Sequence, residues 1–102
     1  MRIEFTFRNI EPSEGIKTYA TQKIAKLQKY LRAPLDARFT LSTERHLHCI
    51  DLNLTADGEV FMGTEESEDM YASIDVVIDK IRTQLTRTKD AYERRRRPSQ
   101  PS

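Results

Sequence analysis

Lysine and arginine side chains recur at regular intervals near the carboxyl end of the 102-residue chain, and their type and spacing suit a chemical role. Lys80, Arg87 and Arg94 are seven residues apart, so on an α-helix they form one row that drifts by only ~20° per step. Arg82 and Lys89 form a second row on the other flank of that helix. Rows of fixed cations match the regularly spaced phosphates of a polyanion. We therefore expect a binding surface here.

A second group of cations lies in the first third of the chain. Lys23, Lys26 and Lys29 project from the flank and outer side of a predicted helix. If this helix packs beside the last one, the two groups merge into a single positive strip that spans several phosphates. Gln84 lies beside the basic row of the last helix and is placed to contact sugars or base edges. The candidate nucleic-acid-binding residues are Lys23, Lys26, Lys29, Lys80, Arg82, Gln84, Arg87, Lys89, Arg94 and Arg95.

Other interpretations of these charges stay open. Lysine and arginine are common on the solvated faces of exposed helices, so the pattern can arise without a ligand. The run from Arg94 to Arg97 favours nucleic acid, but polybasic tails also bind acidic membranes or acidic proteins. The sequence contains no phosphate-binding loop, no HExxH pattern and no Ser/His/Asp order. We therefore expect neither an enzyme nor a small-molecule substrate.

The net charge of +1 conceals a strong segregation of charge along the chain. Residues 1–39 contain eight Lys/Arg and four Asp/Glu, whereas residues 40–79 contain one Lys/Arg and ten Asp/Glu. Residues 80–102 contain eight Lys/Arg and two Asp/Glu, so the three segments carry +4, −9 and +6. Charge sorted along a chain usually becomes charge sorted over a surface, and a basic surface on a nearly neutral protein favours a polyanionic partner.

The only cysteine and both histidines lie close together, which raises the question of a metal site. On a strand, His46 and His48 share a face while Cys49 points away, and a fourth ligand is missing. We therefore expect no metal and no cofactor. A single cysteine cannot form an internal disulfide, which fits a reducing compartment. The chain has no apolar run near the ~20 residues of a membrane span and no signal-peptide cleavage site, so we expect a cytoplasmic protein.

Apolar periodicity predicts the elements that position the cations. Residues 2–8 alternate apolar and polar side chains, which indicates a strand with one buried face. Residues 16–31 keep a 3.6-residue period until Ala33-Pro34 ends the helix. Residues 36–44 and 47–56 again alternate, as strands do. The last helix, within residues 68–97, has an apolar stripe of Met70, Ile74, Val77, Ile78, Ile81 and Leu85.

Turn residues fix how the strands pair. Asp57-Gly58 predicts a two-residue hairpin, because a type I′ turn needs positive φ at both positions. That turn pairs Leu54 with Phe61. A second turn, placed at Arg45-His46, pairs Leu41 with Ile50, and all of these apolar pairs fall on one face. Val60 and Met62 are expected on the other, polar face as exceptions.

The element order is therefore β-α-β-β-β-α, an α+β fold of two layers. A right-handed first crossover leaves strands one and two parallel and places both helices on one face of the four-stranded sheet. We expect one domain over residues 1–93. Residues 94–102 are expected to form a basic, disordered tail, since PSQPS offers nothing to a core.

Three segments together resemble the ribosome hibernation promoting factor family, which includes the ribosome-associated inhibitor protein Y. They are GIKTYATQKIAKLQKY, the Asp-Gly hairpin and EDMYASIDVVIDKIRTQLTR. The resemblance covers about residues 1–92, and an older label for such proteins is modulator of sigma-54. It implies a βαβββα domain that binds the small ribosomal subunit in the cleft for messenger RNA and the A- and P-site transfer RNAs. Such proteins block translation in starved or stationary-phase cells and favour hibernating ribosomes.

The resemblance also implies which residues contact ribosomal RNA. The basic positions of the family fall on Lys23, Lys26, Lys29, Lys80, Arg87 and Lys89, with Arg82 and Gln84 between them. Long members append a second domain that pairs ribosomes, whereas this sequence stops at RRRRPSQPS. We therefore expect it to act as a short form, with a separate ribosome-dimerising factor if it forms dimers.

Two other function classes stay open from sequence. A general double-stranded-RNA-binding module has a similar αβββα core with a basic helix, and it would bind any RNA duplex equally well. A regulator that docks on a sigma factor would use the acidic middle segment and would retain its partner after ribonuclease treatment.

Overall fold

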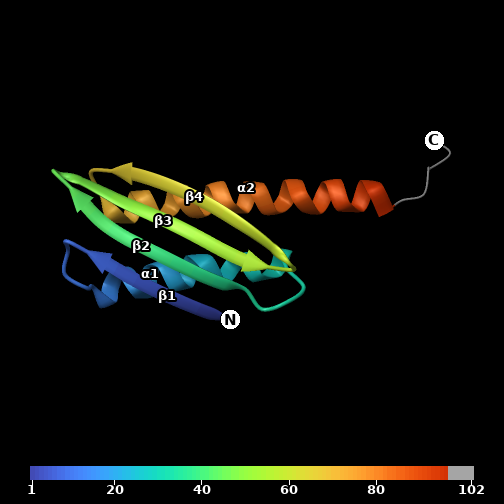
Figure 1. Cartoon of the computed structure of the whole chain (residues 1–102), viewed down its shortest axis with the longest axis horizontal. Helices are drawn as coiled ribbons and strands as arrows, with labels where there is room; N and C mark the ends of the chain where they lie inside the picture. Colours follow the sequence, from blue (N-terminus) through green and yellow to red (C-terminus); the bar gives the residue numbers. More distant parts are fainter. Residues whose placement is uncertain (97–102) are drawn as a thin grey trace.

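The computed structural model describes residues 1–96 of the chain, with side chains up to Thr88. The strands are β1 (Arg2–Arg8), β2 (Asp36–Glu44), β3 (Leu47–Ala56) and β4 (Glu59–Ser67). The helices are α1 (Glu14–Ala25), the short 3-10 helix η1 (Lys26–Tyr30) and α2 (Met70–Arg96). The strands lie side by side in the order β1-β2-β3-β4, with β1 parallel to β2 and the other neighbours antiparallel (Figure 1). The predicted βαβββα topology is confirmed.

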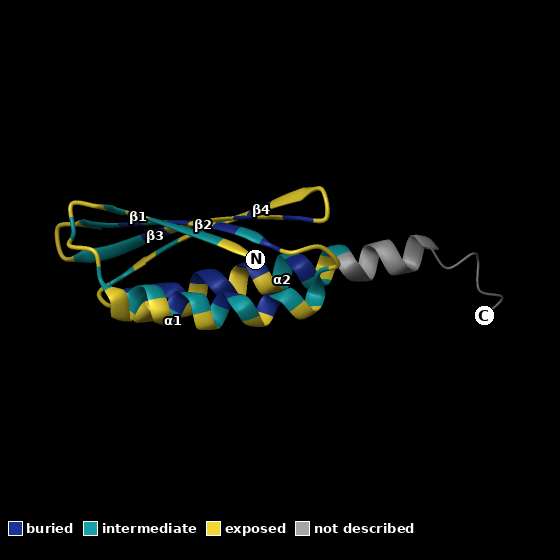
Figure 2. Cartoon of the chain, turned by 90° about the horizontal axis from the view of Figure 1, so that it is seen from below, coloured by how far each residue is buried: buried dark blue, intermediate teal, exposed yellow. Residues whose placement is uncertain are grey.

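The two helices cover one face of the sheet and leave the other face open, which gives the predicted two layers (Figure 2). The core lies between the layers, where Phe39, Leu52 and Ile74 are almost fully shielded from solvent. All six residues of the predicted apolar stripe of α2 are buried. On the open face, Val60 and Met62 are exposed, as the alternation of β4 predicts.

The strand registers agree with those predicted from the turns. Leu54 pairs with Phe61 across the Asp57-Gly58 hairpin, and Leu41 pairs with Ile50. Asp57 and Gly58 have φ angles of 53° and 78°, which are the positive values that the two-residue turn requires. Apolar pairing and turn chemistry therefore specify the same meander.

The first helix differs from the prediction, which ran as one α-helix to about residue 31. The α-helix ends at Ala25 and continues as η1 to Tyr30. The amide of Gln28 explains the tighter turn, because it donates to the Ala33 carbonyl at 2.8 Å and accepts from the Leu35 N–H at 2.9 Å. These bonds hold the loop that leads into β2 against the end of the helix. A continued α-helix would place Gln28 differently and break these bonds.

Helix α2 is longer than the part of it that packs on the sheet. Its last buried residue among those with described side chains is Leu85, and beyond this point the helix projects past the sheet (Figure 1). The 27 residues of α2 correspond to a rod of about 40 Å. The backbone stays helical to Arg96, so α2 includes the first three residues of the tail expected over residues 94–102. Residues 97–102 lie outside the described part.

Within the described residues, none of the helices has the length and apolar character needed to cross a membrane.

Candidate nucleic-acid interface

Side chains join the two helices directly. The Tyr19 hydroxyl donates to Asp75 Oδ1 at 2.6 Å, and the rings of Tyr19 and Tyr71 meet edge to face with centroids 5.0 Å apart. The Lys23 ammonium lies 3.9 Å from the same Asp75 carboxylate oxygen. The hydrogen bond to Asp75 raises the pKa of Tyr19, since the phenolate would lose its acceptor and face a carboxylate. These contacts place Lys23 of α1 next to α2.

Arg82 lies on this same inner flank of α2. Its guanidinium forms an ion pair with Asp79, one turn earlier. The hydrogen bond to Asp79, followed by one to the Tyr30 hydroxyl, raises the pKa of Arg82. Lys29 is close by, with its ammonium 5.2 Å from the centre of the Tyr30 ring. Arg82 and Lys29 are therefore brought together through Tyr30.

Lys80 and Gln84 lie on the opposite flank of α2, against β4. The Lys80 ammonium is 2.8 Å from Glu65 Oε2 and donates to the Thr64 carbonyl at 3.1 Å. The Gln84 amide donates to the Met62 carbonyl at 2.9 Å. The hydrogen bond from Lys80 lowers the pKa of Glu65, and the N–H of Glu66 lowers it further. Both side chains thus already have partners within the protein.

Lys26 and Arg87 are the exposed cations that stand apart from these pairs. In the part of the chain with described side chains, neither forms an ion pair with a carboxylate. The predicted positions Lys89, Arg94 and Arg95 lie in the α2 backbone, but their side chains fall outside the described residues.

The candidate residues form two rows rather than the single strip expected from sequence. Lys23, Lys29 and Arg82 lie where the helices meet, whereas Lys80 lies across α2 at the sheet edge. The sequence pattern identified both flanks of the helix, but it could not show which flank would meet β4. The carboxylates in these pairs were also missed, although Asp79 and Arg82 have the i, i+3 spacing of a helical ion pair.

The ion pairs leave these cations available to an anion. The side chains of Lys23, Lys80 and Arg82 are 39%, 49% and 48% exposed. Ion pairs between such exposed groups contribute little to stability, because solvent screens them. A phosphate can therefore replace the carboxylate at little cost, although the displaced carboxylate stays nearby and reduces the gain.

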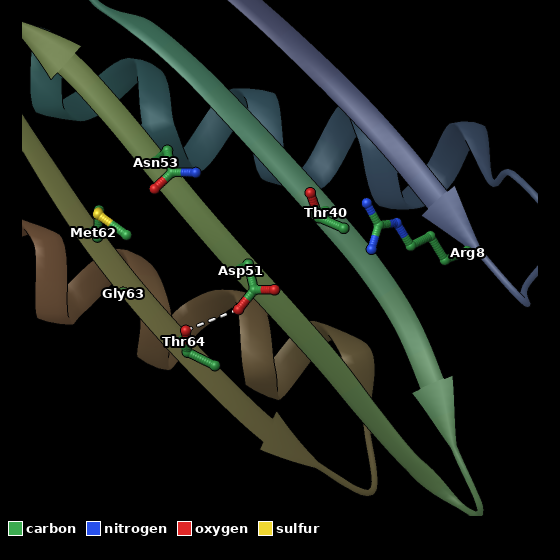
Figure 3. Close-up of a pocket in the computed structure, with 7 residues that line it drawn as sticks. All are labelled: Arg8, Thr40, Asp51, Asn53, Met62, Gly63 and Thr64. Carbon is green, nitrogen blue, oxygen red and sulfur yellow. Dashed lines mark hydrogen bonds between the residues drawn. The ribbon is translucent and has the colours of Figure 1, made fainter.

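The open face of the sheet carries a separate polar depression of about 350 Å³ (Figure 3). Arg8 extends from β1 toward Thr40, and the Thr64 hydroxyl donates to Asp51 at 2.8 Å. The sheet separates this depression from the helices, so it is not continuous with either cation row. It is lined by Arg8, Thr40, Asp51, Asn53, Met62, Gly63 and Thr64.

Comparison with known proteins gives a consistent assignment. Residues 3–93 match the family model described as sigma 54 modulation protein / S30EA ribosomal protein. The chain is 37% identical over 90 residues to the ribosome hibernation promoting factor of Salmonella typhimurium, covering 88% of this chain and 95% of that protein. The corresponding Escherichia coli K12 factor is 36% identical over the same shares.

A solved structure supports the same relationship. The N-terminal domain of Thermus thermophilus protein Y superimposes with a TM-score of 0.82 and 30% sequence identity, over 86% of this chain and 99% of that domain. The fold and the family model thus agree over nearly all of the described residues. The chain belongs to the sigma 54 modulation protein / S30EA ribosomal protein family, which it shares with the ribosome hibernation promoting factors that it resembles.

Proposed function

We propose that the protein is a cytosolic translation inhibitor that binds the small ribosomal subunit and promotes ribosome hibernation in starved or stationary-phase cells. The observation that carries this proposal is the helical layer, in which two neighbouring helices cover one face of the sheet (Figure 2). In a chain of this family, these helices carry the exposed cations Lys26, Lys29, Lys80, Arg82 and Arg87. The relatives are named for ribosome hibernation, which supplies the identity of the polyanion.

The proposed mechanism is competition for the decoding cleft, where messenger RNA and transfer RNAs bind. The helical layer lies against ribosomal RNA, and the protruding C-terminal end of α2 extends the interface beyond the sheet. Lys26 and Arg87 bind phosphates directly, while Lys23, Lys29 and Arg82 form the row between the helices. Lys80, Gln84, Lys89, Arg94 and Arg95 complete the proposed RNA-binding set.

Charge reversal at Lys26 and Arg87 tests this interface. Lys26→Glu combined with Arg87→Glu changes the charge by −4 without breaking an ion pair between described residues. We expect weaker cosedimentation with small subunits. The slope of log K against log salt should become shallower by about 0.7 to 0.9 for each phosphate that the variant no longer neutralises.

The matched control carries the same charge change on the open face of the sheet. Arg8→Glu with Arg38→Glu breaks the exposed ion pair of Arg38 with Glu4 but leaves the helical layer intact. Once a urea unfolding curve shows that the control is folded, its binding should fall far less than that of the helix variant. Equal weakening in both variants would mean that net charge, and not the helical layer, determines binding. Equal affinity of the unmodified protein for ribosomes and for any RNA duplex would favour a general double-stranded-RNA-binding module instead.

A further inference from the structure

Strand β4 forms one edge of the described sheet, with β3 as its only strand neighbour there. Along an antiparallel strand, the residues alternate. One residue directs both its N–H and its C=O toward the neighbouring strand, and the next directs both away from it. The carbonyls of Met62 and Thr64 accept hydrogen bonds from α2 side chains, so these two residues direct their backbone groups to the free side. Such unpaired groups are a ready template for another strand.

Side chains occupy this free edge at successive outward positions. Gln84 donates to the Met62 carbonyl at 2.9 Å, and Lys80 donates to the Thr64 carbonyl at 3.1 Å. Glu65 completes the set, because it pairs with Lys80 at 2.8 Å and accepts from the Glu66 N–H at 3.2 Å. We call Glu65, Lys80 and Gln84 the β4 edge cap.

A glycine lets α2 approach closely enough for the cap to form. Gly63 lies between the two capped carbonyls, and a Cβ atom there would be only 3.1 Å from Val77 Cγ2. A side chain at this position would push the helix away from the strand. Met62, Gly63 and Thr64 therefore act together. Gly63 lets α2 lie against β4, and the carbonyls of Met62 and Thr64 accept hydrogen bonds from the polar side chains of α2.

The edge is otherwise well suited to pair with a second copy of this chain. β4 has nine residues, and Val60 and Met62 on its open face are 62% and 64% exposed. Antiparallel pairing of β4 with itself about a two-fold axis would continue the sheet and bring these apolar side chains of the two copies together. We propose that the β4 edge cap blocks this pairing and keeps the chain monomeric, a second role for Lys80 and Gln84 beside the RNA contacts proposed above.

Removing the cap tests the proposal. In Lys80→Ala with Gln84→Ala, alanine keeps the helix favourable while the Met62 and Thr64 carbonyls lose their donors. We expect the weight-average mass from sedimentation equilibrium to rise with concentration from 11.9 kDa toward twice that value. The N–H groups of Met62 and Thr64 should become protected from hydrogen exchange in the concentrated samples only.

Two further variants make the result specific. Lys17→Ala with Gln22→Ala removes the same residue types from α1, together with the ion pair of Lys17 to Glu14, and should stay at the monomer mass. Adding Met62→Pro to the uncapped variant removes an outward N–H that no described strand of the monomer uses, and should restore the monomer.

A folded uncapped variant that stays at 11.9 kDa at every concentration would overturn the proposal. So would association that leaves the Met62 and Thr64 amides unprotected or survives Met62→Pro. If the double variant does not unfold cooperatively, Gln84→Ala alone removes one capping bond and is judged by the same measurements.

Discussion

At the scale of single residues, Asp57 has a second role that its place in a hairpin turn does not reveal. Its carboxylate accepts hydrogen bonds from the backbone N–H of Arg32 at 3.1 Å and of Ala33 at 2.9 Å. These bonds join the β3–β4 turn to the loop after η1. The Ala33 N–H, and then the Arg32 N–H, lower the pKa of Asp57. The sequence predicted the turn from Asp57-Gly58, but the partners are 24 and 25 residues away and follow only from the fold.

Asp57→Asn should destabilise the protein near neutral pH, because the amide keeps one acceptor oxygen and no charge. Since folding lowers the pKa of Asp57, its ionised form stabilises the protein above the unfolded pKa of about 4. That contribution is lost as the pH falls through the lower folded pKa. Urea midpoints of both proteins should therefore differ at pH 7 and converge in acid. A constant difference across pH would contradict the role of the charge.

Tyr19 shows the opposite direction of shift. Because folding raises its pKa, the neutral phenol stabilises the protein below its unfolded pKa of about 10, and this contribution is lost as the pH rises through the folded pKa. Tyr19→Phe should lower the urea midpoint at pH 7. In an ultraviolet titration it should remove a tyrosine component that ionises above pH ~10. If that high component persists in the variant, the hydrogen bond to Asp75 is not its cause.

At the scale of elements, the sequence specified strands, helices and registers because each rests on local periodicity or turn chemistry. The pairs Leu54–Phe61 and Leu41–Ile50 followed from counting outward from two turns. The break between α1 and η1 was missed, since it depends on Gln28 reaching a loop that forms only in the fold. The flank of α2 that meets β4 was missed for the same reason.

The close approach of α2 to β4 gives a prediction about these two elements. Gly63→Ala should destabilise the protein by about 1–3 kcal/mol, the usual cost of overpacking, because the new methyl group meets Val77. In a Val77→Ala background the same change should cost less, with a coupling energy of about 0.5–3 kcal/mol. Urea unfolding of the four proteins measures this coupling. Additive effects would show that Val77 is not what excludes a side chain at Gly63.

At the scale of the whole molecule, charge is divided between faces and flanks rather than gathered in one strip. Cations lie between the helices, along the outer flank of α2 and on the open face, and several are paired with carboxylates. Sequence reasoning found the cations from their spacing but not their partners, because Glu65 and Asp75 are distant in sequence from Lys80 and Lys23. In the proposed complex, ribosomal RNA competes with the protein's own acidic groups. Because the protein would neutralise several phosphates of the RNA, we expect binding to depend steeply on salt.

Occupancy of the decoding cleft is tested most directly by competition on the ribosome. The unmodified protein is sedimented with small subunits that are empty, or that carry messenger RNA and initiator transfer RNA, at several salt concentrations. We expect it to sediment with empty subunits and to be absent from filled ones, with affinity falling as salt rises. Equal cosedimentation with empty and filled subunits would show that the protein binds elsewhere on the ribosome.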